Sequence, residues 1–191
     1  SSLLSGDIME PLYPHKVLRF TETEYLSEGG AHALPFQMGT IGALGVIRNA
    51  ASGTGTGHVL ALATDGVCAF DFSIPRSLWK EQPLSQVLFF GCGCASPWSV
   101  VNLNDDLMYR SQDGIRSIHY TRAQAAGGAG ALSNVPLSNE VEPFLTNDTD
   151  YLPRVSSAVW DNRVAMTCLG WSNLQDIGFY GFTVFDTAAS Y

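Results

Sequence analysis

Residues 99–120, SVVNLNDDLMYRSQDGIRSIHY, decide the fold, because short apolar runs alternate there with polar turns. Valine, leucine, tyrosine and isoleucine are typical of strands, and Asn-Asp-Asp and Asp-Gly are turn sequences. The stretch predicts three antiparallel strands over 99–103, 107–110 and 115–120, with turns at 104–106 and 113–114. A meander of this kind is a building unit of all-β proteins.

The same hairpin pattern recurs along the chain. The other copies are ALATDGVCAFDF (61–72), with a turn at Asp65-Gly66, and SAVWDNRVAMTC (157–168), with a turn at Asp161-Asn162. Further strands are predicted at 40–48, 86–91 and 178–186. The meanders follow one another at the spacing of propeller blades. We therefore predict an all-β fold of antiparallel meanders, β-propeller-like, with a β-sandwich as the alternative.

The predicted strands are too few for a complete propeller. About ten strands fill only two or three four-stranded blades, and a closed ring needs at least about four. The propeller is therefore expected to be incomplete, or part of a larger ring. We divide the chain into an irregular N-terminal segment, residues 1–38, and a meander domain, residues 39–191. A short helix is expected near 20–30, where Thr21 and Glu24 have capping-box spacing.

Composition limits the classes of function. Of 191 residues, 46% are hydrophobic and only 15% are charged, which is typical of a packed globular chain rather than a disordered one. The net charge of −8 argues against binding to a phosphate backbone. No apolar run reaches about 18 residues, so no membrane span is predicted. No signal peptide pattern is visible, and the first residue is not Met, so we expect a processed chain or part of a longer one.

Two motifs suggest a bound ligand, and neither has the required pattern. GTGTG (53–57) lacks the third glycine and the helix of a dinucleotide loop, and it lacks the lysine of a P-loop. Cys92 and Cys94 are separated by one residue and have no second pair, whereas structural zinc uses four ligands at wider spacing. All four cysteines, which include Cys68 and Cys168, are expected to be reduced and mostly buried.

Candidate catalytic groups are scattered. The chain has no nucleophile elbow, and the histidines, His15, His32, His58 and His119, are isolated in sequence. Four carboxylates, Glu140, Glu142, Asp148 and Asp150, lie in an acidic stretch without an aromatic platform or a calcium-loop glycine. We interpret that stretch as a solvated acidic loop. The sequence predicts no catalytic residue, no cofactor site and no metal site, and hence a chain that is not an enzyme.

Four arginines lie beside turns or strand ends: Arg76, Arg110, Arg116 and Arg163. We expect them to bridge carboxylates or carbonyl groups between sheets, because a guanidinium group offers five donors in a planar fork. The alternative is contact with DNA in a channel, but no aromatic–basic stripe accompanies these arginines.

Three segments resemble β-propeller-type virion structural proteins of tailed bacteriophages, above all nozzle or stabilisation proteins at the end of short tails. The first segment is FDFSIPRSLW (70–79), with Pro75, Arg76 and Trp79. The matching residues of the second segment, within 101–122, are Asn104, Asp106, Leu107, Arg110, Ser111, Asp113, Gly114, Ile115, Arg116 and Ser117. The third segment has Asp161, Asn162, Arg163 and Thr167. The match covers about residues 58–186 in the same order, although members of this family are usually much longer.

The resemblance implies a structural role in the virion tail, reached by assembly in the host cytoplasm. The implied partners are copies of the chain itself, in a ring of six around a DNA passage, and neighbouring tail proteins. DNA would pass without sequence-specific binding. The alternative function is a carbohydrate- or receptor-binding β module, suggested by Trp79, Trp98, Trp160 and Trp171.

Overall fold

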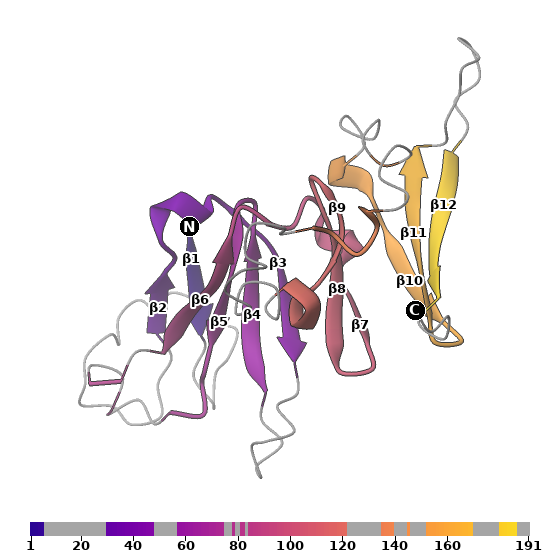
Figure 1. Ribbon diagram of the computed structural model, residues 1–191. Helices are drawn as coiled ribbons and strands as arrows, with labels where there is room; N and C mark the ends of the chain where they lie inside the picture. Colours follow the sequence, from indigo (N-terminus) through magenta and orange to yellow (C-terminus); the bar gives the residue numbers. More distant parts are fainter. Residues whose placement is uncertain are drawn as a thin grey trace.

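The computed structural model describes residues 1–5, 30–47, 57–74, 78, 81–82, 84–121, 135–139, 145, 152–169 and 180–186. Within these ranges the chain forms four antiparallel sheets, shown in Figure 1. They consist of β1 (Ser2–Ser5) and β2 (Gly30–Ala33); β3 (Ile41–Ile47), β4 (His58–Ala63), β5 (Gly66–Phe70) and β6 (Ser85–Phe90); β7 (Val101–Leu103), β8 (Asp106–Ser111) and β9 (Gly114–Ser117); and β10 (Ser157–Trp160), β11 (Arg163–Leu169) and β12 (Tyr180–Asp186).

The all-β prediction is confirmed. Helical structure among the described residues is limited to short turns, which include η1 (Phe36–Met38), η3 (Pro97–Ser99), η7 (Leu152–Arg154) and residues 118–121. None of the described helices has the length and apolar character needed to cross a membrane. Each of the three larger sheets is a meander, because its strands pair in the order in which they follow along the chain.

The opening stretch folds as β7, β8 and β9, but the boundaries differ from the prediction. β7 begins at Val101 rather than at 99, because Pro97–Ser99 form η3, and the second turn is Gln112-Asp113 rather than 113–114, because Ser111 pairs with Gly114. The first turn is only Asn104-Asp105, because Leu103 pairs with Asp106, which begins β8. The third strand ends at Ser117 rather than at 120, because residues 118–121 form a helical turn. The turn predicted at Asp65-Gly66 also moves by one residue, since Ala63 pairs with Gly66 and the loop is Thr64-Asp65.

The N-terminal segment 1–38, predicted to be irregular, contributes ordered structure. β1 pairs with β2, and Leu3, Leu34 and Met38 are buried against the four-stranded sheet β3–β6. This pairing joins residues that are far apart in sequence, so local patterns do not reveal it. Most of the helix expected near 20–30 lies outside the described residues.

The sheets stack face to face in chain order. Leu60 and Leu62 of β4 face a cluster shared with β8, whereas Ala61 and Ala63 face the cluster shared with β1 and β2. A third cluster joins the sheet β7–β9 to β11, and it contains Leu103, Met108, Ile115, Leu145, Val164 and Met166. Successive strand residues point to opposite faces. The near-continuous apolar character of β4 and β5 therefore reflects burial on both faces, and β8 is also buried on both faces although it contains Arg110 and Ser111.

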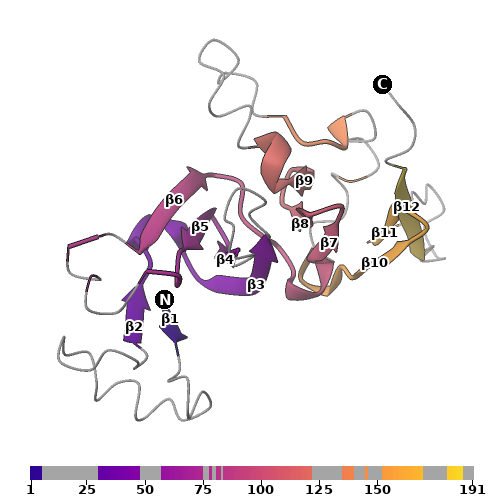
Figure 2. The same ribbon diagram turned by 90° about the horizontal axis from the view of Figure 1, so that it is seen from below.

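The three larger sheets spread apart like a fan when viewed along their strands (Figure 2). Their first strands, β3, β7 and β10, lie side by side, and their last strands, β6, β9 and β12, lie farther apart. Turn and strand side chains join the first strands: Asn102 Nδ2 donates to the Val46 carbonyl at 3.1 Å, and Asn104 Nδ2 donates to Asn162 Oδ1 at 2.7 Å. The sheet β1–β2 lies at one end of this fan and the sheet β10–β12 at the other.

Candidate functional site: the central hairpin and the groove beside it

The hairpin β8–β9 contains the segment that carries the resemblance, and its polar side chains bond within the protein. Asp106 accepts hydrogen bonds from the backbone N–H groups of Leu107 at 2.8 Å and His119 at 3.1 Å, and from the hydroxyl of Ser117. Ser117 Oγ in turn accepts from the backbone N–H of Tyr120 at 3.1 Å. Asp106 and Ser117 thus hold the helical turn 118–121 against the end of the hairpin, which explains why β9 stops at Ser117.

An ion pair between a buried arginine and a partly exposed aspartate closes the β8–β9 turn. Arg116 Nε donates to Asp113 Oδ1 at 3.0 Å, and a second guanidinium nitrogen of Arg116 donates to Asp113 Oδ2. Arg116 is only 1% exposed. Burial raises the pKa of Asp113, but the hydrogen bonds and the positive charge of Arg116 outweigh this effect, so the pKa lies below its ordinary value. Asp113 therefore stays ionised and paired near neutral pH.

The hairpin also fastens segments that are distant in sequence. Arg110, buried beside the core, donates to the carbonyl of Leu145 at 2.9 Å. The Ile115 N–H donates to Ser138 Oγ at 2.9 Å. Gly114 has a φ of 154°, and a Cβ there would lie 2.6 Å from Ser138 Oγ, so glycine allows the close approach. The motif residues act as structural anchors in this chain.

The arginines differ from the prediction in what they join. Arg110 bonds to a segment outside its own sheet, whereas the bonds of Arg116 to Asp113 and of Arg163 to Asp186 lie within their own sheets. The guanidinium groups of Arg110 and Arg116 are both buried, so neither lies on a surface that DNA would contact. Arg76 lies outside the described residues.

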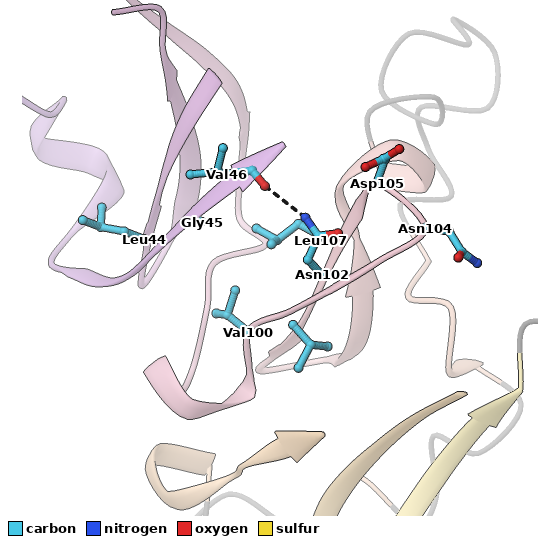
Figure 3. Close-up of a pocket in the computed structure, with 9 residues that line it drawn as sticks. Leu44, Gly45, Val46, Val100, Asn102, Asn104, Asp105 and Leu107 are labelled. Carbon is cyan, nitrogen blue, oxygen red and sulfur yellow. Dashed lines mark hydrogen bonds between the residues drawn. The ribbon is translucent and has the colours of Figure 1, made fainter. Parts of the chain in front are cut away.

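A groove of about 740 Å³ lies between the free edges of β3 and β7 (Figure 3). Leu44, Gly45 and Val46 line one side, and Val100, Val101, Asn102, Asn104, Asp105 and Leu107 line the other. A Cβ on Gly45 would lie 2.5 Å from a Leu107 methyl carbon, so glycine allows the two sheets to approach closely. The lining is apolar apart from two amides and one carboxylate. Its one carboxylate, on Asp105, has no nucleophile beside it among these lining residues, so the groove suits packing rather than chemistry.

Cys68, Cys92 and Cys94, whose side chains the structure describes, do not form a metal site, and the side chain of Cys168 lies outside the described part. Cys68, Cys92 and Cys94 are buried and reduced, as predicted, and Cys94 Sγ donates to the Ser96 carbonyl at 3.0 Å. Burial raises the pKa of Cys68 and of Cys94, which keeps both as thiols. No cluster of three or more histidine, cysteine, aspartate or glutamate side chains occurs among the residues that the structure describes.

The other chemical candidates remain dispersed. His32 packs edge-on to Phe72, and His58 Nε2 lies 4.0 Å from Asp71 Oδ2 at a partly exposed position. The third described histidine, His119, lies in the helical turn 118–121 and is exposed. The predicted acidic loop with Glu140, Glu142, Asp148 and Asp150, and also His15, Trp79, Trp171 and the GTGTG loop apart from Gly57, lie outside the described residues.

The sequence did not single out the groove as a surface. Asn102, Leu44 and Val46 belong to different meanders, and only the packing of two sheets brings them together. Trp98 and Trp160 are exposed, at 71% and 73%, and Arg163 lies 5.9 Å from the centre of a Trp160 ring. The sequence had suggested both tryptophans as candidate carbohydrate contacts from their residue type alone.

Comparisons of this chain with protein-family models, curated proteins and solved structures give no match. The geometry described above is therefore the basis for assigning a function.

Proposed function

We propose that this chain is a structural component of a phage virion, associated with the tail as a nozzle or stabilisation-type protein. It would act by self-assembly and by packing against neighbouring tail proteins around a DNA passage. The observation that carries the proposal is the use of the motif residues. Asp106, Arg110, Asp113, Arg116 and Ser117 all bond within the protein, as expected if the motif maintains a scaffold rather than a chemical site.

The arrangement of the sheets supports a propeller-like architecture for this scaffold. Small antiparallel meanders stack face to face in chain order, and their first strands lie side by side. Radial stacking of this kind hides sheet faces without enclosing a catalytic pocket. The buried thiols and dispersed histidines offer no nucleophile beside a base, so we propose a role without enzymatic chemistry.

Electron cryo-microscopy of particles from the native source tests the proposal directly. We expect ring-shaped density at the tail into which the stack β3 to β12 can be placed, with copies of the chain around a central passage. A chain that is found only free in solution, and never in particles, contradicts a virion role.

A second candidate function is binding of carbohydrate or a receptor. It is favoured by one observation, the exposed Trp160 ring beside Arg163 and Asp186, because sugars stack on aromatic faces and bond to charged side chains. A glycan array distinguishes this candidate. Binding that is lost in Trp160→Ala but kept in Trp98→Ala would favour it, and an array without a hit would remove it.

A further inference from the structure

Strand β3 has one edge at which its backbone groups are left without a partner strand. β4 pairs with β3 on one side, and no described strand pairs with it on the other. The Val46 carbonyl points away from β4, because it accepts from Asn102 Nδ2 at 3.1 Å. Alternate residues of a strand direct their N–H and C=O groups to the same side. The N–H of Val46 and both backbone groups of Leu44 therefore also point away from β4, and no printed hydrogen bond of the described chain satisfies them.

These free backbone groups, which we name the β3 edge, border the groove between β3 and β7 (Figure 3). The side chains beside them are apolar and in solvent, since Leu44 is 55% exposed and Val46 is 52% exposed. The groove volume of about 740 Å³ is in the range of about 300 to 1,000 Å³ that is typical of binding pockets. The β3 edge therefore combines free donors, a free acceptor and exposed apolar side chains beside an open groove.

The β3 edge lacks the features that protect an edge strand from pairing. Natural edge strands usually contain a charged side chain, a proline or a bulge. The stretch from Leu44 to Ile47 has the sequence LGVI, and the bulge between Ile41 and Ala43 lies before it. An edge of this kind favours the addition of a further strand.

The outer edge of β9 shows how this fold covers an edge elsewhere. A distant segment runs beside it, and Leu137 N–H donates to the Ile115 carbonyl at 2.9 Å. The Ile115 N–H in turn donates to Ser138 Oγ at 2.9 Å. An extended segment thus satisfies the outward backbone groups of β9, and the same kind of occupant fits the outward groups of β3.

Charge indicates the chemistry of the occupant. Asp105 is exposed, and it is the one charged side chain among the residues that line the groove. The whole chain carries a net charge of −8. A segment with a lysine or arginine would complement both this carboxylate and the overall charge, whereas an acidic segment would be repelled.

We propose that an extended, basic segment of a neighbouring protein adds to the β3 edge as an antiparallel strand. Its backbone bonds to Leu44 and Val46, its alternate apolar side chains lie beside theirs, and a basic side chain pairs with Asp105. The antiparallel direction follows the strand pairs of the described sheets, which are antiparallel. The inference deepens the packing against neighbouring proteins in the proposed function, and it rests on that function for the identity of the partner.

A synthetic peptide tests the inference on the full chain. The probe is Lys-Thr-Val-Thr-Val-Thr-Lys, capped at both ends and carrying a fluorescent label, and anisotropy measures its binding. We expect saturable binding to the wild-type chain. The matched peptide with glutamate in place of both lysines should bind about two- to fivefold more weakly. Asp105→Asn should reduce that difference, because asparagine tolerates the positive φ of this turn position but carries no charge.

Backbone methylation of the peptide shows whether binding occurs by strand addition. In an antiparallel pair, residues that exchange hydrogen bonds have their side chains on the same face of the sheet. The peptide valines, placed beside Leu44 and Val46, should therefore donate their N–H groups to β3. Methylating both valine nitrogens should abolish binding, and methylating two threonine nitrogens instead should preserve it.

A substitution in β3 tests the same bonds from the side of the protein. Val46→Pro removes the outward N–H without removing a bond to β4, and edge strands tolerate proline at such positions. It should weaken peptide binding about tenfold. Val46→Thr is the matched control, because it keeps the N–H and a β-branched side chain, and it should bind nearly as well as the wild type. Circular dichroism checks folding, and Leu44→Pro replaces Val46→Pro if that variant does not fold.

The other outcomes overturn the inference. A folded wild-type chain that does not bind the lysine peptide does so, as does binding that survives valine methylation or the proline variant. Light scattering that shows paired wild-type chains and single Val46→Pro chains would mean that a second copy occupies the β3 edge, which also overturns it. A chain that occurs in particles but binds no peptide would lose only this inference, whereas one that binds the peptide but never occurs in particles would lose only the virion role.

Discussion

The central sheet β7–β9 and the end sheet β10–β12 are built alike but differ in burial. In both sheets the first two strands are joined by a two-residue turn in which both residues have positive φ, at 52° and 63° for Asn104-Asp105 and at 46° and 60° for Asp161-Asn162. Both contain an arginine–aspartate ion pair. Arg116 in the central sheet is 1% exposed, whereas the side chain of Arg163 in the end sheet is 36% exposed. The same local pattern is therefore expected to contribute more to stability in the central sheet than in the end sheet.

The largest expected effect comes from the core of the central sheet. Leu107 of β8 is buried against β3, and Leu107→Ala should lower the free energy of unfolding by about 3 kcal/mol, through lost burial and a residual cavity. Urea unfolding followed by circular dichroism measures this change. Trp160→Ala in the end sheet is the comparison, and for single chains we expect a change of less than about 0.5 kcal/mol. Equal losses would mean that both sheets are buried alike.

The two ion pairs sharpen the comparison further. Arg116→Met keeps most of the buried stem but leaves Asp113 without its partner, and it should cost about 2 kcal/mol, a value reduced by the partial exposure of Asp113. Arg163→Met should have a much smaller effect, because solvent screens its pair with Asp186. Parallel urea titrations of the two variants measure the difference. A larger loss in Arg163→Met would reverse our ranking of the sheets.

The strands were predictable wherever apolar runs alternate with turn residues. The all-β class, the strands at 40–48, 86–91 and 178–186, and the turn at Asp161-Asn162 follow from local pattern, and the structure confirms them. The pairing of β1 with β2 was not predictable, because it joins residues about 30 positions apart that carry no strong strand pattern. The end of β9 was missed for a related reason: Asp106, eleven residues before Ser117, stops the strand by holding the turn.

The site was less predictable than the fold. The sequence shows arginines and carboxylates close together at the turns, but it does not show which of these side chains are buried. Arg116 and Arg163 have similar turn neighbours, and only the stacking of sheets on both sides of β8–β9 separates their environments. Predicting the groove likewise requires knowing how the sheets pack, because its two sides belong to two meanders. These meanders are joined there by the hydrogen bond from Asn102 to the Val46 carbonyl.

Substitutions of the turn residues Asn104 and Asn162 should have an intermediate effect on the free energy of unfolding. Asn104→Ala places an ordinary side chain at positive φ and removes the bond to Asn162, so it should cost about 1 to 2 kcal/mol. Asn104→Gly relieves the conformational cost but not the lost bond, so it should be the milder change. Asn162→Ala and the double variant complete a mutant cycle that isolates the bond between the two turns. Strict additivity would show that the turns do not couple the sheets.

The smallest expected effect is a difference in acid sensitivity between two aspartates. The pKa of Asp113 lies below its ordinary value because of Arg116, and that of Asp71 does so because Ser73 Oγ donates to it at 2.5 Å. A lowered pKa in the folded state contributes stability above the ordinary value of 3.8, and the contribution is lost as the pH falls through the folded pKa. Wild-type stability should therefore decline below about pH 4.

Urea midpoints between about pH 6 and about pH 2 separate the two contributions. Arg116→Met should reduce the fall of the urea midpoint at low pH, because the pKa of Asp113 then lies nearer its value in the unfolded chain. The difference in urea midpoint between this variant and the wild type should therefore become smaller as the pH falls. Ser73→Ala should change the slope less, since Asp71 lies near the surface and solvent can replace the lost hydrogen bond. A Ser73→Ala variant that reduced the loss of stability at low pH as much as Arg116→Met does would give the opposite result. That result would contradict the idea that burial between the sheets makes the Arg116–Asp113 pair contribute more to stability.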